Sequence, residues 1–389
     1  MKIKDKKQHF YLLFPNIFGF KGGIQVYSAF LLQTLQSLYP LARYNVFLKY
    51  DSQSNTDSQF LQQTQFHCFG DWQKQLQNLL FATKTIWLGI WQRPTLVIAT
   101  HVNYSIACYW LKRLTGIPYW VVVHGLEAWN LQNPLHQAAL RYADQIVAVS
   151  QYTRNRLLKE QQLEGNKIAV LPNTFSAKHF NIAPKPKYLQ KRYRLKPEQP
   201  IILTVTRLGR SAIYKGYDQI LQALVKVRDR FPDIHYILVG KGDDTPRIKA
   251  LINNLNLQDC VTLTGFVSDE ELCDHYNLCD VFALPSIGEG FGIVYLEALA
   301  CGKPIIAGNR DGAVDPLVQG TLGCLINPND VEAISKSLIQ ILDGSHPNPL
   351  MYQPQVLRQK AIERFELAQF RETLFKLVDN DPHIEPNCI

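Results

Sequence analysis

The sequence has little that would point to a membrane-spanning or disulfide-linked protein. None of the apolar runs among its 389 residues approaches the ~18 residues that a transmembrane helix needs. The eight cysteines are scattered and no two form a C-x-x-C pair. The first residues, MKIKDKKQHFYLLF, end in a short apolar run that meets Pro15, unlike a secretory signal. We therefore expect reduced thiols and a cytoplasmic protein.

Runs of like charge are also missing. Charged residues make up only 19% of the chain, and neither a run of five like charges nor a Cys/His zinc spacing occurs. This argues against nucleic acid as a partner, although the formal net charge is +8. Residues 1–175 carry 17 Lys and Arg against 8 Asp and Glu, whereas residues 176–389 carry 24 against 25. The positive surplus therefore lies entirely in the first half.

Short apolar runs alternate with amphipathic stretches along the whole chain. This alternation is typical of βαβ units, so it predicts an α/β fold with parallel sheets. At 46% apolar residues the chain has enough material for a core, and its length suggests two domains. The expected strands are residues 9–14, 44–49, 95–100, 118–123, 145–149, 167–171, 201–206, 234–239, 260–264, 280–284, 304–307 and 322–326.

The alternation divides the chain into four parts. Residues 1–175 form a first α/β domain, and the proline-rich residues 176–200 form a linker with a short helix. Residues 201–354 form a second domain, and residues 355–389 form a C-terminal helix, over 355–378, and a tail. Two such domains imply a cleft, and ligands of open parallel sheets bind outside the carboxyl ends of the strands.

The strongest local motif is Ser-Ile-Gly-Glu-Gly-Phe-Gly-Ile-Val-Tyr-Leu-Glu-Ala at residues 286–298, directly after an expected strand. Its glycines let a ligand approach the backbone, and the helix beginning near Gly292 offers a positive end that suits phosphate. The carboxylates of Glu289 and Glu297 would repel phosphate. We therefore expect them to accept hydrogen bonds from the hydroxyls of a sugar or ribose.

Three further features follow other expected strands. Arg207 and Lys215 flank the loop after residues 201–206 and are two cations placed to hold a pyrophosphate. Gly22 and Gly23 lie between the first strand and first helix, where they again permit close backbone approach. His124 follows Pro-Tyr-Trp-Val-Val-Val; a histidine there is more often structural than catalytic, so it gains meaning only beside the other three.

Together these features resemble glycosyltransferase family 4, whose members are retaining, nucleotide-sugar-dependent enzymes with two Rossmann-like domains facing across a cleft, the GT-B fold. The resemblance covers nearly the whole chain. Gly22-Gly23, His124, Leu171-Pro172-Asn173, the Arg207 and Lys215-Gly216 pair, and above all residues 289–298 carry it. Residues 309–315 also resemble those of cyanobacterial exopolysaccharide enzymes, such as those that make heterocyst envelope polysaccharide.

The resemblance implies a role for each matching position. Arg207 and Lys215 would hold the donor diphosphate, Glu297 the ribose hydroxyls, and Glu289 the donor sugar. His124 would face the sugar near the reacting carbon, and the C-terminal helix would cross back to the first domain. The remaining donor contacts would come from Gly22, Gly23, Val267, Gly290, Phe291, Gly292 and Ile293.

The implied function is transfer of a hexose from a nucleoside-diphosphate sugar to a saccharide or lipid-linked saccharide acceptor in polysaccharide biosynthesis. UDP-glucose is the favoured donor, over GDP-sugars, and no cofactor is expected. Metal is not expected either, because the D-x-D at Asp379-Asn380-Asp381 follows a helix and is interpreted as a solvated tail. In this fold the first domain binds the acceptor, so its positive surplus could rest on an anionic membrane, with Lys2, Lys4, Lys6, Lys7 and the apolar residues 76–91.

Three other classes are weighed against a transferase. A nicotinamide-dependent oxidoreductase would show G-x-G-x-x-G after the first strand, and this sequence does not. A nucleotide-sugar epimerase of the same architecture would convert the donor without an acceptor and remains an alternative. A non-catalytic subunit is disfavoured because Arg207, Lys215, Glu289 and Glu297 are all present. The apolar residues 76–91, considered above for membrane contact, could equally form a helix packed in the core.

Overall fold

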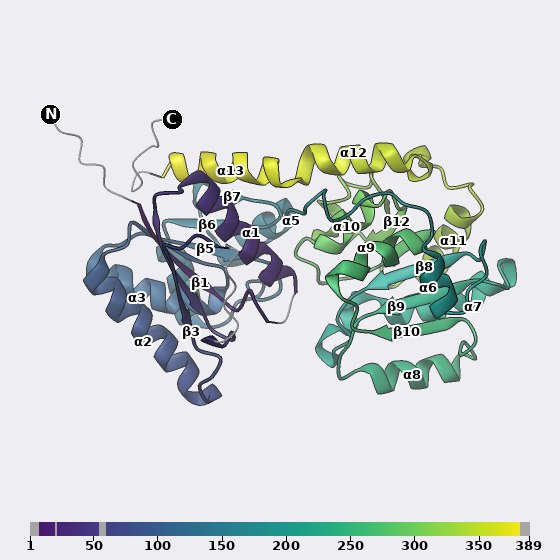
Figure 1. Cartoon of the computed structure of the whole chain (residues 1–389), viewed down its shortest axis with the longest axis horizontal. Helices are drawn as coiled ribbons and strands as arrows, with labels where there is room; N and C mark the ends of the chain where they lie inside the picture. The colour runs from purple at the N-terminus through teal and green to yellow at the C-terminus, as the bar shows by residue number, and fades with distance from the viewer. Residues whose placement is uncertain (1–7, 20–21, 54–59, 382–389) are drawn as a thin grey trace. The chain divides into compact units, whose positions relative to one another are not determined.

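The computed structural model describes residues 8–19, 22–53 and 60–381. The chain forms two compact units, one comprising Met1–Thr174 and Leu367–Ile389 and the other Phe175–Glu366 (Figure 1). Each unit holds a parallel β-sheet with helices packed against it. The expectation of two Rossmann-like α/β domains is confirmed.

The first unit is built on a sheet with the strand order β3-β2-β1-β4-β5-β6-β7 among the described residues. Every neighbouring pair is parallel. Helices cover both faces of such a sheet, which explains the uninterrupted apolar run of β5, whose residues are all buried. The strands are β1 (His9–Phe14), β2 (Arg43–Leu48), β3 (Thr64–Cys68), β4 (Leu96–Ala99), β5 (Tyr119–Val123), β6 (Gln145–Ala148) and β7 (Ile168–Val170).

Strand β3 is the one element of this sheet that the sequence analysis did not predict. Its sequence, Thr-Gln-Phe-His-Cys, has one strongly apolar residue, and none of its side chains is fully buried. It lies at the edge of the sheet and pairs only with β2 among the described strands. An edge strand needs no apolar run, so the pattern that revealed the central strands was missing here.

Local capping signals set several helix starts in the first unit. The Ser150 side chain accepts a hydrogen bond from the backbone of Thr153 at the start of α5, and Asn133 caps α4 in the same way. The helices are α1 (Gly23–Leu38), α2 (Lys74–Gln92), η2 (Val102–Tyr104), α3 (Ser105–Thr115), α4 (Pro134–Tyr142), α5 (Gln151–Gln161), η3 (Gly165–Lys167) and α13 (Leu367–Asp379).

The second unit repeats the arrangement with the strand order β10-β9-β8-β11-β12-β13. Its strands are β8 (Ile201–Val205), β9 (His235–Val239), β10 (Val261–Gly265), β11 (Val281–Leu284), β12 (Ile305–Gly308) and β13 (Cys324–Ile326). Its helices are α6 (Lys187–Arg192), η4 (Arg210–Lys215), α7 (Tyr217–Arg230), α8 (Thr245–Asn254), α9 (Asp269–Leu278), α10 (Ile293–Ala300), η5 (Gly312–Val314), α11 (Val331–Leu342), η6 (Pro349–Tyr352) and α12 (Pro354–Phe365). Residues 176–200, expected as a linker, lie in this unit and contain α6.

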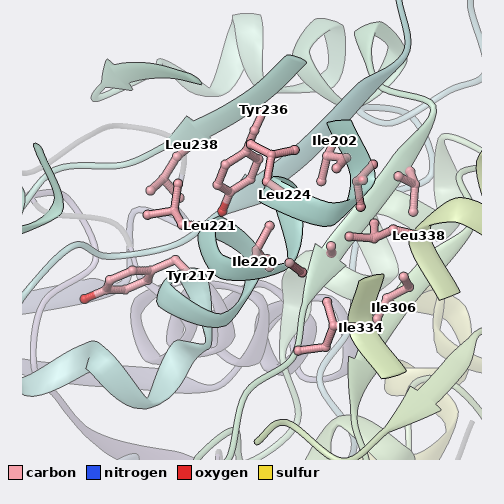
Figure 2. Close-up of a cluster of buried hydrophobic side chains, with 14 of the residues drawn as sticks. Ile202, Tyr217, Ile220, Leu221, Leu224, Tyr236, Leu238, Ile306, Ile334 and Leu338 are labelled. Carbon is pink, nitrogen blue, oxygen red and sulfur yellow. The ribbon is translucent and has the colours of Figure 1, made fainter. Parts of the chain in front are cut away.

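Figure 2 shows the core of the second unit, where side chains of α7 and α11 pack against strands of the sheet. The large aromatic residues in it keep their polar ends satisfied. The Tyr217 hydroxyl donates to Asp244 (2.8 Å), and the Tyr236 hydroxyl donates to Thr204 (2.9 Å). This rigid core supports the loops at the carboxyl ends of the strands.

The C-terminal segment differs from the single helix expected over 355–378. It forms two helices, α12 and α13, separated at Glu366, which is extended and pairs with Phe175 in a parallel β-bridge. Helix α12 packs against α10 of the second unit, whereas α13 packs against α1 of the first. The segment therefore does cross back to the first domain. The break depends on a partner far away in the sequence, so the apolar periodicity did not reveal it.

The interpretation of Asp379-Asn380-Asp381 as a solvated tail is wrong for Asp381. This residue is 8% exposed, and its Oδ2 accepts a hydrogen bond from the indole nitrogen of Trp120 (2.7 Å). The bond joins the end of α13 to β5, so the carboxylate serves the docking of the C-terminal helix. None of the described helices is long and apolar enough to cross a membrane.

Candidate active site

The second sheet has its topological switch point between β8 and β11, where the strand order reverses. In open parallel sheets the loops after such a pair of strands leave toward opposite sides, and ligands bind there, outside the carboxyl ends of the strands. Arg207 follows β8, and Glu289 lies in the loop that follows β11. The sheet topology thus brings together two of the strongest motifs of the sequence.

Lys215 and Glu289 form an ion pair in this region, from Lys215 Nζ to Glu289 Oε1. Each side chain is only 12% exposed, so the pair is largely removed from solvent. The two loops also touch through their backbones, because the amide of Ile287 donates to the carbonyl of Tyr214 (3.0 Å). The predicted cation and carboxylate are therefore neighbours, 74 residues apart in the sequence.

Gly216 makes this approach possible. It has a φ of +84°, and a Cβ added there would lie 2.2 Å from the carbonyl oxygen of Pro285. Only glycine meets both conditions without strain. The conformation of Gly216 therefore places Lys215 beside the loop that carries Glu289.

Asp311 holds Glu289 in place and was not singled out as a site residue from the sequence. Its Oδ2 accepts hydrogen bonds from the Glu289 amide (2.7 Å) and the Ser286 hydroxyl (2.6 Å), and its Oδ1 accepts one from the Ala313 amide (3.0 Å). Its side chain is fully buried, and this burial raises the pKa of Asp311 to about 7. An Asp-Gly pair in the loop shortly after a buried strand was the available signal, because Asp often caps the turn that follows.

Arg207 has a different environment from Lys215. Its side chain is exposed, and within the described residues it makes no hydrogen bond or ion pair. A guanidinium with five free donors at the carboxyl end of a strand is suited to a phosphate or diphosphate. The site thus contains one paired cation and one unpaired cation.

The start of α10 supplies backbone donors next to these cations. Gly292 adopts a φ of +88° at the N-cap, and no side chain caps the helix. The side chains of Phe291 and Ile293 are buried, and the Phe291 ring contacts Phe365 at 5.7 Å. Only the backbone of Gly290, Phe291, Gly292 and Ile293 is therefore suited to contact a ligand.

Glu297 lies farther along α10 and is half-buried. Its Oε2 accepts a hydrogen bond from the Tyr276 hydroxyl of α9 (2.6 Å). Burial raises the pKa of Glu297 to about 7, against the opposing effect of this hydrogen bond. Tyr276 is thus a positioning residue for Glu297 that the sequence analysis missed.

Val267 lies apart from this cluster, after β10 at the edge of the sheet. It is half-buried, and within the described part of the chain its backbone amide and carbonyl form no hydrogen bond. The neighbouring Phe266 ring is 65% exposed, with Lys241 Nζ 5.1 Å from its centre. An exposed ring and free backbone groups together suit a planar heterocyclic base.

The remaining predicted residues lie in the first unit. Gly22 precedes α1 in an extended conformation, and a Cβ added to Gly23 would meet no atom within 4 Å. The buried Asp51, another residue missed from the sequence, fixes the preceding loop. It accepts hydrogen bonds from the amides of Ile17 (2.7 Å), Phe18 (3.1 Å) and Gly19 (2.9 Å). Because no atom lies within 4 Å of a Cβ added to Gly23, the fold itself gives no steric reason for glycine at this position.

His124 follows β5 and is half-buried. Its Nε2 lies 3.1 Å from the carbonyl oxygen of Thr100, and its ring makes an edge contact with Tyr27 at 5.1 Å. Because a carbonyl only accepts, Nε2 carries the proton and Nδ1 is left as an acceptor. Burial, helped by His101, lowers the pKa of His124 to about 3, so the ring is neutral.

Two family models match the chain. Residues 187–363 match the family described as "Glycosyl transferases group 1", and residues 46–178 match "Glycosyltransferase Family 4". The ion pair of Lys215 and Glu289 lies in the first match, and His124 lies in the second.

Two curated proteins illustrate the similarity. A "GDP-mannose-dependent alpha-(1-6)-phosphatidylinositol monomannoside mannosyltransferase" of Mycolicibacterium smegmatis is 33% identical over 56% of this chain and 59% of its own length. The chain thus spans about three fifths of that relative. A "2-deoxystreptamine glucosyltransferase" of Streptomyces kanamyceticus is 28% identical over 65% of this chain and 68% of its own.

Solved structures extend the likeness to nearly the whole chain. Sucrose-phosphate synthase from Thermosynechococcus elongatus has a TM-score of 0.80 at 19% identity, covering 95% of this chain and 98% of that one. Anabaena HepE in complex with UDP and glucose has a TM-score of 0.76 at 18% identity, covering 96% and 99%. The fold is that of the GT-B glycosyltransferases, and the group 1 and family 4 models together match most of the chain.

Proposed function

We propose that this protein is a retaining glycosyltransferase that moves a hexose from a nucleoside-diphosphate sugar to a saccharide or lipid-linked saccharide acceptor in polysaccharide biosynthesis. The observation that carries the proposal is the cluster at the switch point of the second sheet. There an unpaired Arg207 accompanies the buried pair of Lys215 and Glu289. The cluster combines groups for a diphosphate with a group for sugar hydroxyls.

The cations stabilise the leaving group. A nucleoside diphosphate departs with negative charge on its β-phosphate, so preorganised cations lower the barrier more than a strong general acid would. Arg207 has its donors free, and Lys215 uses one of its three donors on Glu289. The uncapped N-terminus of α10 adds backbone amides. In this scheme the cations need no metal ion, and full activity in EDTA is the expected result.

Glu289 acts as an acceptor for the donor sugar rather than as a nucleophile. Its backbone is held by Asp311 and its Oε1 by Lys215, so the carboxylate is fixed in one orientation. A carboxylate committed to a cation is a weak nucleophile but a strong acceptor for sugar hydroxyls. Retention then follows from attack on the face that the diphosphate leaves, with the leaving phosphate taking the proton of the acceptor.

His124 and the start of α1 contribute from the first unit. The neutral His124 ring has Nδ1 available to accept a hydrogen bond from a sugar hydroxyl near the reacting carbon. We assign Gly22 and Gly23 to a phosphate of the donor, because the space beside Gly23 is open and a helix N-terminus attracts anions.

Different groups bind the base and the ribose of the donor in this proposal. We assign the base to the free backbone groups of Val267 and the ribose hydroxyls to Glu297. UDP-glucose remains the favoured donor, and GDP-mannose is the competing one, because a 33% identical relative is described as GDP-mannose-dependent. A backbone contact at Val267 can serve either base, so a direct binding measurement must distinguish the two donors.

Calorimetric titration with UDP-glucose, GDP-mannose and ADP-glucose, followed by transfer to saccharide and lipid-linked acceptors, tests the proposal. One nucleotide sugar should bind, and its sugar should appear on an acceptor with retained anomeric configuration. Binding of no nucleotide sugar would overturn the proposal. Conversion of the donor into another nucleotide sugar without an acceptor would instead indicate an epimerase.

Exposed tryptophans of the first unit favour a membrane-bound acceptor. Four of the six tryptophans have exposed side chains, Trp72 (53%), Trp87 (60%), Trp91 (74%) and Trp110 (48%). They lie on or beside α2 and α3, two helices that pack together, and α2 carries two lysines and no acidic residue. The core-packing alternative for residues 76–91 explains Phe81 but not Trp87 and Trp91. The lysines at positions 2, 4, 6 and 7 lie outside the described residues.

We propose that these exposed tryptophans contact an anionic bilayer. Flotation with vesicles containing phosphatidylglycerol should recover the protein at low salt, and the W87A/W91A variant should bind more weakly. Tyr352→Ala removes an exposed aromatic side chain from the second unit and serves as the matched control. Absence of binding to anionic vesicles at both low and physiological salt would contradict the membrane proposal without affecting the donor site.

A further inference from the structure

Two thiols of the second unit lie in contact. Cys273 is in the second turn of α9, Cys301 directly follows α10, and their sulfur atoms are 3.9 Å apart. Cys273 is half-buried, whereas Cys301 is 1% exposed. Among the described cysteines no other two thiols are this close. The pair therefore combines one thiol that solvent reaches with one that it does not.

The surroundings distinguish the two sulfurs chemically. The two thiols share a hydrogen bond in which either sulfur can be the donor. Cys273 also hydrogen-bonds Asn181 Oδ1 (3.4 Å), and the side-chain amide of Asn277 donates to Cys273 (3.5 Å). The hydrogen bond with Cys301 lowers the pKa of Cys273 against the opposing effect of burial, and Asn181 and the guanidinium of Arg358 lower it further. The pKa of Cys301 is raised, because it shares the proton with Cys273 and is buried. Cys273 is thus the nucleophile and Cys301 the resolving thiol.

We propose that Cys273 and Cys301 form a reversible disulfide when the protein meets a hydroperoxide. The Cys273 thiolate attacks a peroxide oxygen, the O–O bond breaks, and the departing oxygen takes a proton to leave as an alcohol or as water. The Cys301 sulfur then attacks the sulfenic acid of Cys273. The S–O bond breaks as the S–S bond forms, and the departing hydroxide takes the Cys301 proton. Overall, two thiols and one hydroperoxide give a disulfide, one alcohol and one water.

The disulfide would act on the same two helices that position Glu297. Tyr276 lies one turn after Cys273 on α9, and Glu297 lies one turn before Cys301 on α10. The bond from the Tyr276 hydroxyl to Glu297 and the thiol pair are therefore adjacent links between α9 and α10. An S–S bond of about 2.05 Å requires the sulfurs to approach by nearly 2 Å.

The approach can come from rotation of the two cysteine side chains and from movement of α9, because the backbone around Cys301 is held. Before Cys301, the carbonyl of Ala300 accepts a hydrogen bond from Arg358 of α12 (2.5 Å). After Cys301, Gly302 lies so close to Pro354 that a Cβ added to Gly302 would be 2.5 Å from the Pro354 side chain. The first two residues of α9, Asp269 and Glu270, are exposed, whereas Glu271 pairs with Arg192 (2.7 Å). Any movement of α9 on oxidation would displace Tyr276 relative to Glu297.

The consequence for donor binding rests on the proposed function, in which Glu297 holds the ribose. A carboxylate that hydrogen-bonds a ligand must be placed within about 0.5 Å, so displacing its partner weakens the nucleotide site. We expect the oxidised protein to bind the donor roughly fivefold or more weakly than the reduced protein, and dithiothreitol to restore binding.

Hydrogen peroxide treatment of the full chain, followed by peptide mass mapping, tests the disulfide. The wild type should yield a peptide pair joined through Cys273 and Cys301, lighter by two hydrogens, which dithiothreitol removes. Cys273→Ser and Cys301→Ser should yield none, and Cys324→Ser, which replaces another half-buried thiol of this unit, should behave like the wild type. Melting temperatures of the reduced variants show that they fold. Failure of the wild type to form this link in excess peroxide would overturn the proposal.

Titration of the reduced and oxidised proteins with the donor then tests the coupling. A linked protein with unchanged donor affinity would overturn the effect on Glu297. If the reduced protein bound no nucleotide sugar, the proposed function would fail, whereas the mass map would still decide whether the disulfide forms. The failures of the two proposals are therefore distinguishable.

Discussion

The two units hold their candidate site residues in different ways. In the second unit the residues are charged and connected to one another: Lys215 pairs with Glu289, and Asp311 holds the Glu289 backbone. In the first unit they are a neutral histidine and two glycines that offer backbone and open space. The candidate site of the second unit is thus an interconnected set of charged groups, whereas the candidate residues of the first unit are uncharged.

The same difference extends to the surfaces. The first unit has the positive surplus of the sequence and the exposed tryptophans, yet its candidate site residues carry no charge. In the second unit the overall charge is nearly balanced, yet the site concentrates ionised groups. The net charge of a domain therefore says little about its active site. It bears on the partners that the whole surface attracts.

The charged site of the second unit is where we expect the largest effect of substitution. Arg207→Ala, Lys215→Ala and Glu289→Gln should each lower kcat/KM for transfer by about 10²-fold or more, because each removes a charged contact with the donor. Initial rates at subsaturating donor measure the loss. Near-normal transfer by all three variants would remove the proposed site.

Stability separates the two cations. Arg207 is exposed and unpaired, so Arg207→Ala should leave the melting temperature unchanged. Lys215→Ala leaves Glu289 buried without its partner and should lower the free energy of unfolding by up to ~3 kcal/mol. Arg210→Ala, the neighbouring exposed cation, serves as the control and should keep full activity.

Two glycines, one in each unit, test the difference between the units with smaller expected effects. Gly23→Ala adds a methyl group in open space, so the free energy of unfolding should stay the same or rise by up to about 1 kcal/mol. Transfer should nevertheless fall by about 10-fold, as a methyl in the path of a bound phosphate removes one charge-assisted hydrogen bond. Full activity of the stable Gly23→Ala protein would exclude a ligand at the start of α1.

Gly216→Ala should instead damage the protein itself. The added methyl meets the Pro285 carbonyl, and the left-handed backbone alone costs about 1–2 kcal/mol. Thermal unfolding and transfer rates on the two variants therefore give opposite patterns. Loss of stability in Gly23→Ala, or its absence in Gly216→Ala, would contradict the structural difference between the two positions.

The parts of the fold that the sequence predicts are those with local causes. The central strands are apolar on both faces because helices cover both sides, and their runs are visible without any partner. The positions of Arg207, Lys215 and the loop after β11 follow in turn, because parallel strands end at one edge of the sheet. Periodicity and strand ends therefore carried the prediction of the two domains.

The features that the sequence did not predict depend on distant partners. Asp311 meets the Glu289 loop, Asp51 meets the loop before α1, and Glu366 breaks the last helix by pairing with Phe175. None of these pairings leaves a periodic pattern. In the sequence, Asp311 and Asp51 are polar residues in polar loops and would be expected to face solvent. Only the folded structure shows that both are buried and accept hydrogen bonds from loop amides.

The buried histidines of the first unit and the buried carboxyls of the candidate site in the second unit should contribute to the pH dependence of stability with opposite signs, and this is the smallest effect we predict. Burial lowers the pKa of His124 to about 3 and of His67 and His101 to about 4, so the first unit loses stability as the pH falls from about 6.5 toward these values. Burial raises the pKa of Glu297 and Asp311 to about 7. Their contribution to the second unit is complete below about pH 4 and is lost as the pH rises through 7.

Hydrogen exchange measured by mass spectrometry resolves the two units within one protein. Between pH 7 and pH 5, after correction for the intrinsic exchange rate, protection should fall around β4 and β5 and rise around α10 and η5. Glu297→Gln should reduce the response around α10, because an amide does not titrate, and leave the response around η5 and that of the first unit as they were. A common response of both units would mean that other ionisable groups dominate, and that the contrast between a neutral and an ionised site does not control their stability.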